Sequence, residues 1–172
     1  HIGSLSKIWP SIIVGATIYI MDGIKDLNTF FNVVKKVSGK VATFQVPASL
    51  RMLIQFGEKQ LKDCAEKFDF IETGAAPISQ ADMEILCKLL PNTRLYNTYA
   101  STETGIIATH NFNDGYCVAG CLGKPMKHSA ITIDDNGFIV CEGKTLMVGY
   151  YGDTDETNRV LHDNKIFTKD KG

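Results

Sequence analysis

The sequence predicts an α/β protein: a doubly wound parallel sheet portion followed by a small antiparallel β subdomain. Residues 68–99 read as strand, helix and strand, the order of a parallel β-α-β unit with a right-handed crossover. Apolar side chains recur at helical spacing in residues 1–110 and lose that spacing in residues 111–172. The second region instead holds short strand-like runs and a strong hairpin turn at residues 134–137. We therefore place a boundary near residue 110.

The N-terminal part is expected to begin with a helix and a buried strand. Residues 2–14 carry apolar side chains at roughly helical spacing, with Pro10 as a kink or a boundary. The compact β-branched and aromatic run at residues 16–21 is typical of a buried strand. Asp26 stands where the next helix needs an N-cap.

The following elements lead into the predicted β-α-β unit. Residues 41–46 are predicted to form a strand, and Pro47 suits the first turn of the helix after it. The charged residues 58–67 are expected to form a solvated helix. Ser79 and Asp82 resemble a capping box at the start of the helix between the two central strands.

Charge and hydropathy argue against several classes of partner. The 172 residues carry a formal net charge of −1 and are 44% hydrophobic, which provides no electrostatic field for nucleic acid or an anionic membrane. No apolar run approaches the roughly 18 residues of a membrane span. The chain starts without a methionine or a secretory leader and stops directly after a strand-like run, so we expect both ends to be internal to a longer protein.

The cysteines favour a reducing compartment. Their odd number and scattered placement do not form a disulfide framework, which indicates a cytoplasmic protein. Cys117 and Cys121 lie four residues apart, but no second pair or suitably spaced histidine accompanies them. Buried small apolar side chains therefore explain these cysteines better than a zinc site does.

Two small-residue loops follow the two strands of the β-α-β unit. The run Gly-Ala-Ala-Pro at residues 74–77 follows the first strand, and residues 99–103 follow the second. Because ligands bind outside the carboxyl ends of parallel strands, we expect both loops at one sheet edge, where they form a site. Taken alone, the first could be a tight turn and the second a strand-to-helix turn capped by a threonine.

The side chains of these loops suit nucleotide chemistry. Tyr99 offers a flat face for a heteroaromatic ring. Thr102 offers a hydroxyl group, and Glu103 offers a carboxylate that suits a hard cation such as Mg²⁺. Residues 74–77 lack bulk, which lets a ligand lie against free main-chain groups.

The run Tyr-Ala-Ser-Thr-Glu at residues 99–103 resembles the Tyr-Gly-x-Thr-Glu signature of the adenylate-forming (AMP-binding) superfamily. That superfamily includes acyl-CoA synthetases, luciferase-like ligases and the adenylation domains of peptide synthetases. Its tyrosine stacks on adenine, its threonine contacts the α-phosphate and its glutamate supports magnesium. Ala100 replaces the usual glycine, a change that would narrow the pocket beside the acyl group. Residues 74–77 are similar to the family's Gly-(Gly/Ala)-Ala-Pro run, which contacts adenine.

Further segments resemble the family in the same order. His1 is similar to the histidine of a His-x-Gly stretch that borders the acyl pocket. Residues 120–125 resemble Gly-Ser-Val-Gly-x-Pro, although a bulge and turn in a β subdomain explains them better than a functional role. Residues 137–150 look like the family's Gly-Glu…Gly-Tyr segment, with Phe138 in place of the glutamate.

Residues 166–170 resemble the family's Thr-Gly-Asp, whose aspartate grips both ribose hydroxyls. The resemblance implies that Asp170 has this role, although Lys169 replaces the glycine. A carboxylate suits the task because it accepts two hydrogen bonds side by side. Without the resemblance, Asp170 would be an ordinary solvated charge.

The resemblance implies an acyl-CoA synthetase that joins a carboxylic acid to ATP, releases pyrophosphate, and then forms a thioester with coenzyme A. ATP/AMP, Mg²⁺ and coenzyme A are the implied cofactors and co-substrates, and a small-molecule carboxylic acid is the implied substrate. Residues 1–110 would be part of the nucleotide-binding α/β subdomain, and residues 111–172 part of an antiparallel β subdomain. The family's phosphate loop upstream and catalytic lysine downstream are absent, so the isolated chain is expected to be inactive.

The predicted site residues fall into three groups. Catalytic roles are predicted for Thr102 and Glu103, and Glu103 is also the predicted metal ligand. The predicted nucleotide-binding residues are Gly74, Ala75, Ala76, Pro77, Asn97, Tyr99 and Asp170. The predicted substrate-binding residues are His1, Thr98 and Ala100.

Two other functions stay open at this point. The acceptor thiol could belong to the phosphopantetheine arm of a carrier protein. The chain could also be part of a non-catalytic nucleotide-sensing or interaction module, because a fold does not determine a function. A phosphate loop and a catalytic lysine in the longer protein would argue against the second alternative.

Overall fold

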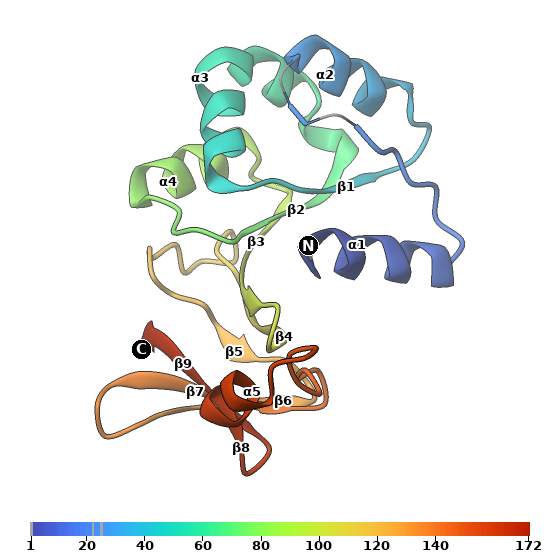
Figure 1. Cartoon of the computed structure of the whole chain (residues 1–172). Helices are drawn as coiled ribbons and strands as arrows, with labels where there is room; N and C mark the ends of the chain where they lie inside the picture. The colour runs from blue at the N-terminus through green and yellow to red at the C-terminus, as the bar shows by residue number, and fades with distance from the viewer. Residues whose placement is uncertain (1, 22, 25) are drawn as a thin grey trace.

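A computed structural model describes residues 2–21, 23–24 and 26–172 of the chain. Its helices are α1 (Ile2–Ile13), α2 (Leu27–Lys36), α3 (Pro47–Asp63), the short 3₁₀ helix η1 (Ala65–Lys67), α4 (Gln80–Leu89) and α5 (Thr154–Val160). Its strands are β1 (Val41–Phe44), β2 (Phe68–Gly74), β3 (Arg94–Ser101), β4 (Gly105–Asn111), β5 (Lys124–Pro125), β6 (Ser129–Ile133), β7 (Phe138–Gly143), β8 (Leu161–His162) and β9 (Lys165–Lys171). Figure 1 shows their arrangement.

A five-stranded sheet with the order β1-β2-β3-β4-β5 organises the first part of the chain. β1, β2 and β3 run parallel, which confirms the predicted β-α-β unit with α4 as its crossover helix. β4 and β5 join the same sheet antiparallel. The register places Gly74 opposite Thr98, so the chain segments that follow β2 and β3 leave the sheet at the same edge.

Helices cover both faces of this sheet, as expected for a doubly wound fold. α2, α3 and α4 bury their apolar side chains against the face that carries Ile71 and Leu95. Glu72 points to the opposite face, because successive strand residues alternate in direction. There its carboxylate pairs with Lys7 of α1, which also lies over the ring of Phe44. Figure 1 shows α1 on the other side of the sheet from α2 and α3.

Local sequence signals position the helices as predicted. The Asp26 carboxylate accepts hydrogen bonds from two backbone N–H groups in the first turn of α2. Pro47 opens α3, and the Ser79 hydroxyl caps α4. The charged stretch predicted as a separate helix instead continues α3 through a kink at Gly57 as far as Asp63. A Cβ at Gly57 would lie 2.9 Å from the Phe31 ring, so the glycine lets α2 and α3 pack closely.

The prediction of a buried strand at residues 16–21 is wrong. This segment has no regular secondary structure, and Ile20 is 85% exposed. Its composition is typical of a strand, but a strand needs a neighbour for its backbone hydrogen bonds, and no described strand pairs with it. Residues 116–122, predicted as strand-like, form a loop, and the short polar helix α5 was not predicted because it has no apolar stripe.

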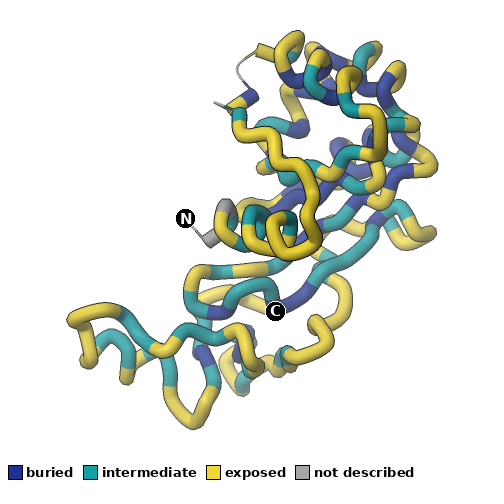
Figure 2. The backbone as a smooth tube through the Cα atoms, turned by 90° about the vertical axis from the view of Figure 1, so that its right-hand side faces the viewer, coloured by how far each residue is buried: buried dark blue, intermediate teal, exposed yellow. Residues whose placement is uncertain are grey.

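The C-terminal strands form a small antiparallel sheet with the order β6-β7-β9-β8. The predicted turn joins β6 to β7, with Gly137 at a φ of 79°. Figure 2 shows that most residues of the small sheet are intermediate or exposed, whereas buried residues concentrate in the part of the chain around the larger sheet. The two sheets meet in one buried cluster, formed by Ile107, Ala108, Ile139, Cys141 and Ile166.

Apolar side chains are exposed on α1 and on the segment that follows it. They include Trp9, Ile12, Ile13 and Val14. No helix among the described residues is long and apolar enough to cross a membrane.

Candidate functional site

Residues 74–77 end β2 with a backbone that requires small side chains. A Cβ at Gly74 would lie 2.7 Å from the carbonyl oxygen of Thr98, so β3 leaves room there only for glycine. Ala75 has a φ of 66°, a left-handed conformation that costs a non-glycine residue roughly 1 kcal/mol. Ala75, Ala76 and Pro77 are exposed, which leaves this stretch open to a ligand.

The second predicted loop is the tip of a β-hairpin. Ser101 pairs with Gly105, so the chain returns as β4 and does not form the strand-to-helix turn considered as the simpler alternative. The Ser101 hydroxyl accepts hydrogen bonds from the backbone N–H groups of Glu103 and Thr104, at 3.2 and 3.1 Å. The buried Thr104 hydroxyl accepts one from the Ser101 N–H at 3.1 Å. These bonds fix the backbone at Glu103 and leave the Thr102 side chain exposed.

The Glu103 carboxylate is held by a tyrosine from the C-terminal part of the chain. The Tyr150 hydroxyl donates a hydrogen bond to Glu103 Oε1 at 2.7 Å. This bond holds the pKa of Glu103 below its ordinary value, whereas partial burial acts in the opposite direction. It also raises the pKa of Tyr150 to about 12. At neutral pH the carboxylate is therefore charged and the tyrosine remains a hydrogen-bond donor.

The oxygen donors at the hairpin tip fit a magnesium ion bound together with phosphate. Carboxylate oxygens are ligands that Mg²⁺ prefers, and the Glu103 carboxylate is charged at neutral pH. Among the described residues, no group of three or more His, Cys, Asp or Glu side chains gathers closely enough to hold a metal ion. The protein would thus supply one carboxylate, and phosphate oxygens and water would complete the shell.

Tyr99 and Asp170 are 71 residues apart in the sequence and meet through a hydrogen bond. The Tyr99 hydroxyl donates to Asp170 Oδ2 at 2.6 Å. Burial is the main cause that raises the pKa of Tyr99, so its hydroxyl stays protonated and acts as the donor. Asp170 lies on β9 and is exposed. Packing of the second sheet against β4 therefore brings the predicted adenine and ribose residues together.

The other predicted strand residues differ in accessibility. Asn97 is buried, and its side-chain amide donates to the carbonyl oxygen of Cys121 at 3.3 Å. Thr98 is also buried, and its hydroxyl contacts a threonine hydroxyl on β4 at 3.1 Å. Ala100 is exposed beside the hairpin tip. His1, predicted to border the acyl pocket, lies outside the described residues.

Cys117 lies beside Cys87, which the sequence did not pair with it. Their Sγ atoms are 3.9 Å apart. Burial is the main cause that raises the pKa of the Cys87 thiol well above its ordinary value. The thiol is therefore neutral at physiological pH, in keeping with the predicted role of a small packing side chain.

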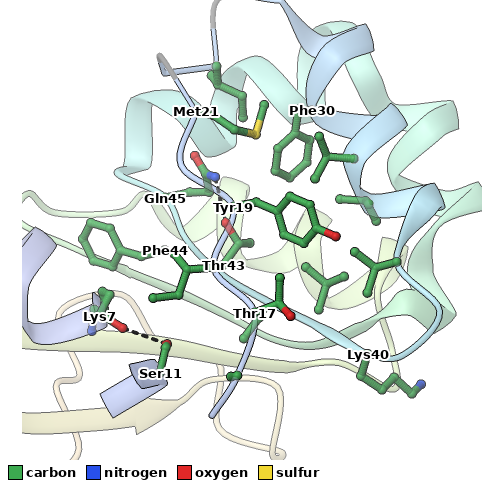
Figure 3. Close-up of a pocket in the computed structure, with 18 of the residues that line it drawn as sticks. Lys7, Ser11, Thr17, Tyr19, Met21, Phe30, Lys40, Thr43, Phe44 and Gln45 are labelled. Atoms are coloured by element: carbon green, nitrogen blue, oxygen red, sulfur yellow. Dashed lines mark hydrogen bonds between the residues drawn. The ribbon is translucent and has the colours of Figure 1, made fainter. Parts of the chain in front are cut away.

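A cavity of about 800 Å³ lies away from the predicted site, between α1, α2 and β1. Tyr19 and Phe30 lie close together beside it, and Lys7 and Phe44 lie toward α1 (Figure 3). None of the described residues predicted for nucleotide, metal or acyl binding lines it. Its wall includes residues of the unpaired 16–21 segment. We attribute the cavity to the open flank of the edge strand β1.

Sequence reasoning missed three residues that contact the hairpin tip. Thr145, Met147 and Tyr150 come from the loop between β7 and α5 and form hydrogen bonds to residues 103–104. The Gly149-Tyr150 pair was part of the family resemblance, but nothing in the sequence assigned it a partner. A contact across 47 residues has no periodic signal that would reveal it.

The structure thus places the two loops at one edge of the larger sheet, where ligands bind in α/β folds, and brings Asp170 of the second sheet into contact with Tyr99. The model of the family described as "AMP-binding enzyme" matches residues 1–151. The chain therefore belongs to the AMP-binding enzyme family.

Two curated relatives align with nearly all of this chain. 2-Succinylbenzoate–CoA ligase of Geobacillus sp. (strain WCH70) is 27% identical over 186 residues, which cover 100% of this chain and 36% of the relative. 4-Coumarate–CoA ligase-like 6 of Arabidopsis thaliana is 26% identical over 187 residues, which cover 99% of this chain and 32% of the relative. The chain spans about a third of the length of the curated relatives it matches.

The o-succinylbenzoate CoA synthetase of Bacillus subtilis has a similar structure. A double mutant bound to the product analogue OSB-NCoA gives a TM-score of 0.85 at 20% identity, covering 99% of this chain and 36% of the other. The complex with AMP gives a TM-score of 0.83 at 20% identity, covering 98% and 35%. These comparisons show that the chains share a fold: a mixed sheet followed by a small antiparallel sheet.

Proposed function

We propose that the protein containing this chain activates a carboxylic acid with ATP and transfers the acyl group to coenzyme A. Membership of the AMP-binding family and similarity to two CoA ligases support this proposal. The observation that carries it is the meeting of Tyr99, Asp170 and residues 74–77 at the edge that also presents Thr102 and Glu103. A nucleotide could occupy this edge with its base near Tyr99 and its phosphates near the hairpin tip.

The proposed nucleotide contacts follow from the chemistry of each group. The Tyr99 ring provides a face for adenine, and the exposed stretch at residues 74–77 provides main-chain groups for the edge of the base. Asp170 accepts hydrogen bonds from the ribose hydroxyls. Its bond from Tyr99 orients the carboxylate before the nucleotide arrives. Asn97 supports this region from within the sheet, because it anchors Cys121.

Thr102 and Glu103 would act where charge develops. The substrate carboxylate attacks the α-phosphorus of ATP, an acyl–phosphate bond forms, and the bond to pyrophosphate breaks. The exposed Thr102 hydroxyl donates a hydrogen bond to an α-phosphate oxygen. Magnesium bound at Glu103 would offset the negative charge on the phosphate oxygens. Glu103 is suited to hold it because the carboxylate stays charged at neutral pH.

The second step requires parts of the protein outside this chain. The coenzyme A thiol attacks the acyl carbonyl carbon of the acyl-adenylate, and AMP leaves. We propose that Ala100, Thr98 and His1 border the acyl group, and that the isolated chain is inactive. We also propose a cytoplasmic location, because the odd number and scattered placement of the cysteines favour a reducing compartment.

The experiment that tests this function is ATP–pyrophosphate exchange by the intact protein, with a panel of aliphatic, aromatic and amino acids. We expect exchange with one class of acid, followed by thioester formation with coenzyme A. Exchange followed by loading of a carrier-protein thiol, but not of coenzyme A, would correct the acceptor. A folded protein that exchanges with no acid in the presence of magnesium would contradict the proposal and favour a binding module.

A further inference from the structure

The loop between β7 and α5 holds the hairpin tip through three hydrogen bonds. The Met147 N–H donates to the Glu103 carbonyl at 2.7 Å, and the Thr145 hydroxyl donates to the Thr104 carbonyl at 2.7 Å. The Tyr150 hydroxyl donates to the Glu103 carboxylate at 2.7 Å. Two bonds therefore fix the backbone of the tip, and one fixes the side chain that the proposed function assigns to magnesium.

Tyr150 is itself held in place before it reaches Glu103. Its backbone N–H donates to the Thr157 hydroxyl of α5 at 2.9 Å. Gly149 has a φ of 147°, and a Cβ there would lie 3.1 Å from the Thr157 side chain. Glycine at this position thus lets the loop approach α5 closely. Because its main chain is anchored, the Tyr150 ring directs its hydroxyl to one place.

We propose that Tyr150 is a positioning residue, which orients the Glu103 carboxylate for the magnesium–nucleotide complex. This inference rests on the proposed function. The Tyr150 hydroxyl binds Oε1, and its anchored main chain gives the carboxylate one orientation toward the ion. Tyr150 touches neither phosphate nor metal in this arrangement and acts only through Glu103.

The charged groups around this pair do not replace the hydrogen bond. Glu156 and Arg159 of α5 face Tyr150 and have opposite effects on its pKa. The groups that act on the Glu103 carboxyl are the Tyr150 hydroxyl, the Ser101 hydroxyl and its own backbone. Without the tyrosine hydroxyl, the Glu103 carboxylate loses the hydrogen bond that fixes its orientation.

The test compares Tyr150→Phe with Tyr151→Phe in the full-length protein. Both changes remove one hydroxyl and keep the ring, but Tyr151 is fully exposed, so its hydroxyl is open to water. For Tyr150→Phe we expect the half-saturating magnesium concentration to rise about tenfold, since a hydrogen bond to a charged group is worth roughly that factor or more. We expect KM for ATP at saturating magnesium, and the unfolding midpoint, to change little. Tyr151→Phe should match the wild type.

Two further measurements separate positioning from a general loss of structure. In Glu103→Gln protein, Tyr150→Phe should cause no additional loss, because its only route of action is gone. The carboxyl ¹³C chemical shift of Glu103 at neutral pH, assigned by its loss in Glu103→Gln, should differ between Tyr150→Phe and wild type. This readout does not require activity.

The outcomes separate this inference from the proposed function. If the wild-type protein shows no pyrophosphate exchange, the proposed function is overturned. The role of Tyr150 in orienting Glu103 for magnesium is then overturned as well. Active wild type with unchanged magnesium dependence in Tyr150→Phe overturns the positioning role alone. An unchanged Glu103 carboxyl chemical shift overturns the hydrogen bond itself. Equal and additive losses in both Glu103 backgrounds would assign Tyr150 a role independent of Glu103.

Discussion

At the scale of single residues, the contact between Tyr99 and Asp170 decides how a nucleotide would be held. Each residue alone is unremarkable in the sequence: an aromatic residue in a strand and an exposed acid near the end of the chain. Their hydrogen bond at 2.6 Å converts them into one surface with an aromatic face and an oriented carboxylate. In the site we propose, recognition of base and ribose would therefore depend on a pair that only the folded chain creates.

Asp170→Asn should weaken ATP binding more than it slows turnover. The change removes the charge that strengthens hydrogen bonds to the ribose hydroxyls, a loss of about 1.5–3 kcal/mol. We expect KM for ATP to rise about tenfold or more, with a smaller effect on kcat, measured by pyrophosphate exchange in the intact protein. Asp135→Asn, at the exposed tip of the β6–β7 hairpin, is the matched control. An unchanged KM for ATP would remove Asp170 from the nucleotide site.

Glu103→Gln should slow turnover more than it weakens ATP binding, the opposite of Asp170→Asn. The amide keeps the size of the side chain but loses the charge that would hold magnesium near the phosphates. We expect kcat to fall about a hundredfold and KM for ATP to change far less, measured over a range of magnesium concentrations. The control is Glu58→Gln on the exposed side of α3. Wild-type turnover in Glu103→Gln would eliminate the proposed metal role.

At the scale of elements, the β2–β3 pair aligns the two halves of the site. Gly74 stands opposite Thr98, and the next residues of each strand become the two functional loops. β3 packs so closely here that a Cβ at Gly74 would lie 2.7 Å from a main-chain oxygen. The site thus depends on strand spacing as much as on its own side chains.

Gly74→Ala should therefore disturb both stability and nucleotide binding. Backbone must move to admit the methyl group, which we expect to lower the free energy of unfolding by about 1–3 kcal/mol. Gly39→Ala is the control, since a Cβ there meets nothing within 4 Å. Urea unfolding, together with ATP affinity, checks this prediction. Equal unfolding midpoints for the two variants would show that β2 and β3 can move apart to admit the methyl group without loss of stability.

At the scale of the whole molecule, α1 and the segment after it expose an apolar surface of the kind that other parts of a protein cover. Trp9 is 59% exposed and Ile13 is 80% exposed. Exposed apolar patches of this kind mark contact surfaces. The chain spans about a third of its curated relatives, so we expect other parts of the longer protein to cover this face.

Trp9 is the only tryptophan of the chain and reports directly on this surface. Acrylamide should quench its fluorescence more strongly in the 172-residue chain than in the full-length protein, with every other tryptophan of the latter replaced by phenylalanine. The emission maximum should also lie at longer wavelength in the shorter chain, because water reaches the indole. Equal quenching in both proteins would mean that this face stays open and has no intramolecular partner.

Local signals predicted much of the fold because their causes are local. The capping roles of Asp26 and Ser79 depend on bonds within one helical turn, and the hairpin at residues 134–137 depends on its own turn residues. The strand prediction at residues 16–21 is wrong because it depended on a contact outside the segment. β-Branched composition indicates that a segment can form a strand, but a neighbouring strand must be present to pair with it.

The sequence by itself determined the α/β class, the β-α-β unit and the membership of a nucleotide-binding family, because helix periodicity, turns and motifs are properties of short segments. Only the tertiary structure decided that Tyr99 meets Asp170 and that Tyr150 holds Glu103. Both contacts join residues far apart in the chain, and both require the second sheet to pack against β4. Such contacts arise from burial of shared apolar surface, which no local pattern encodes.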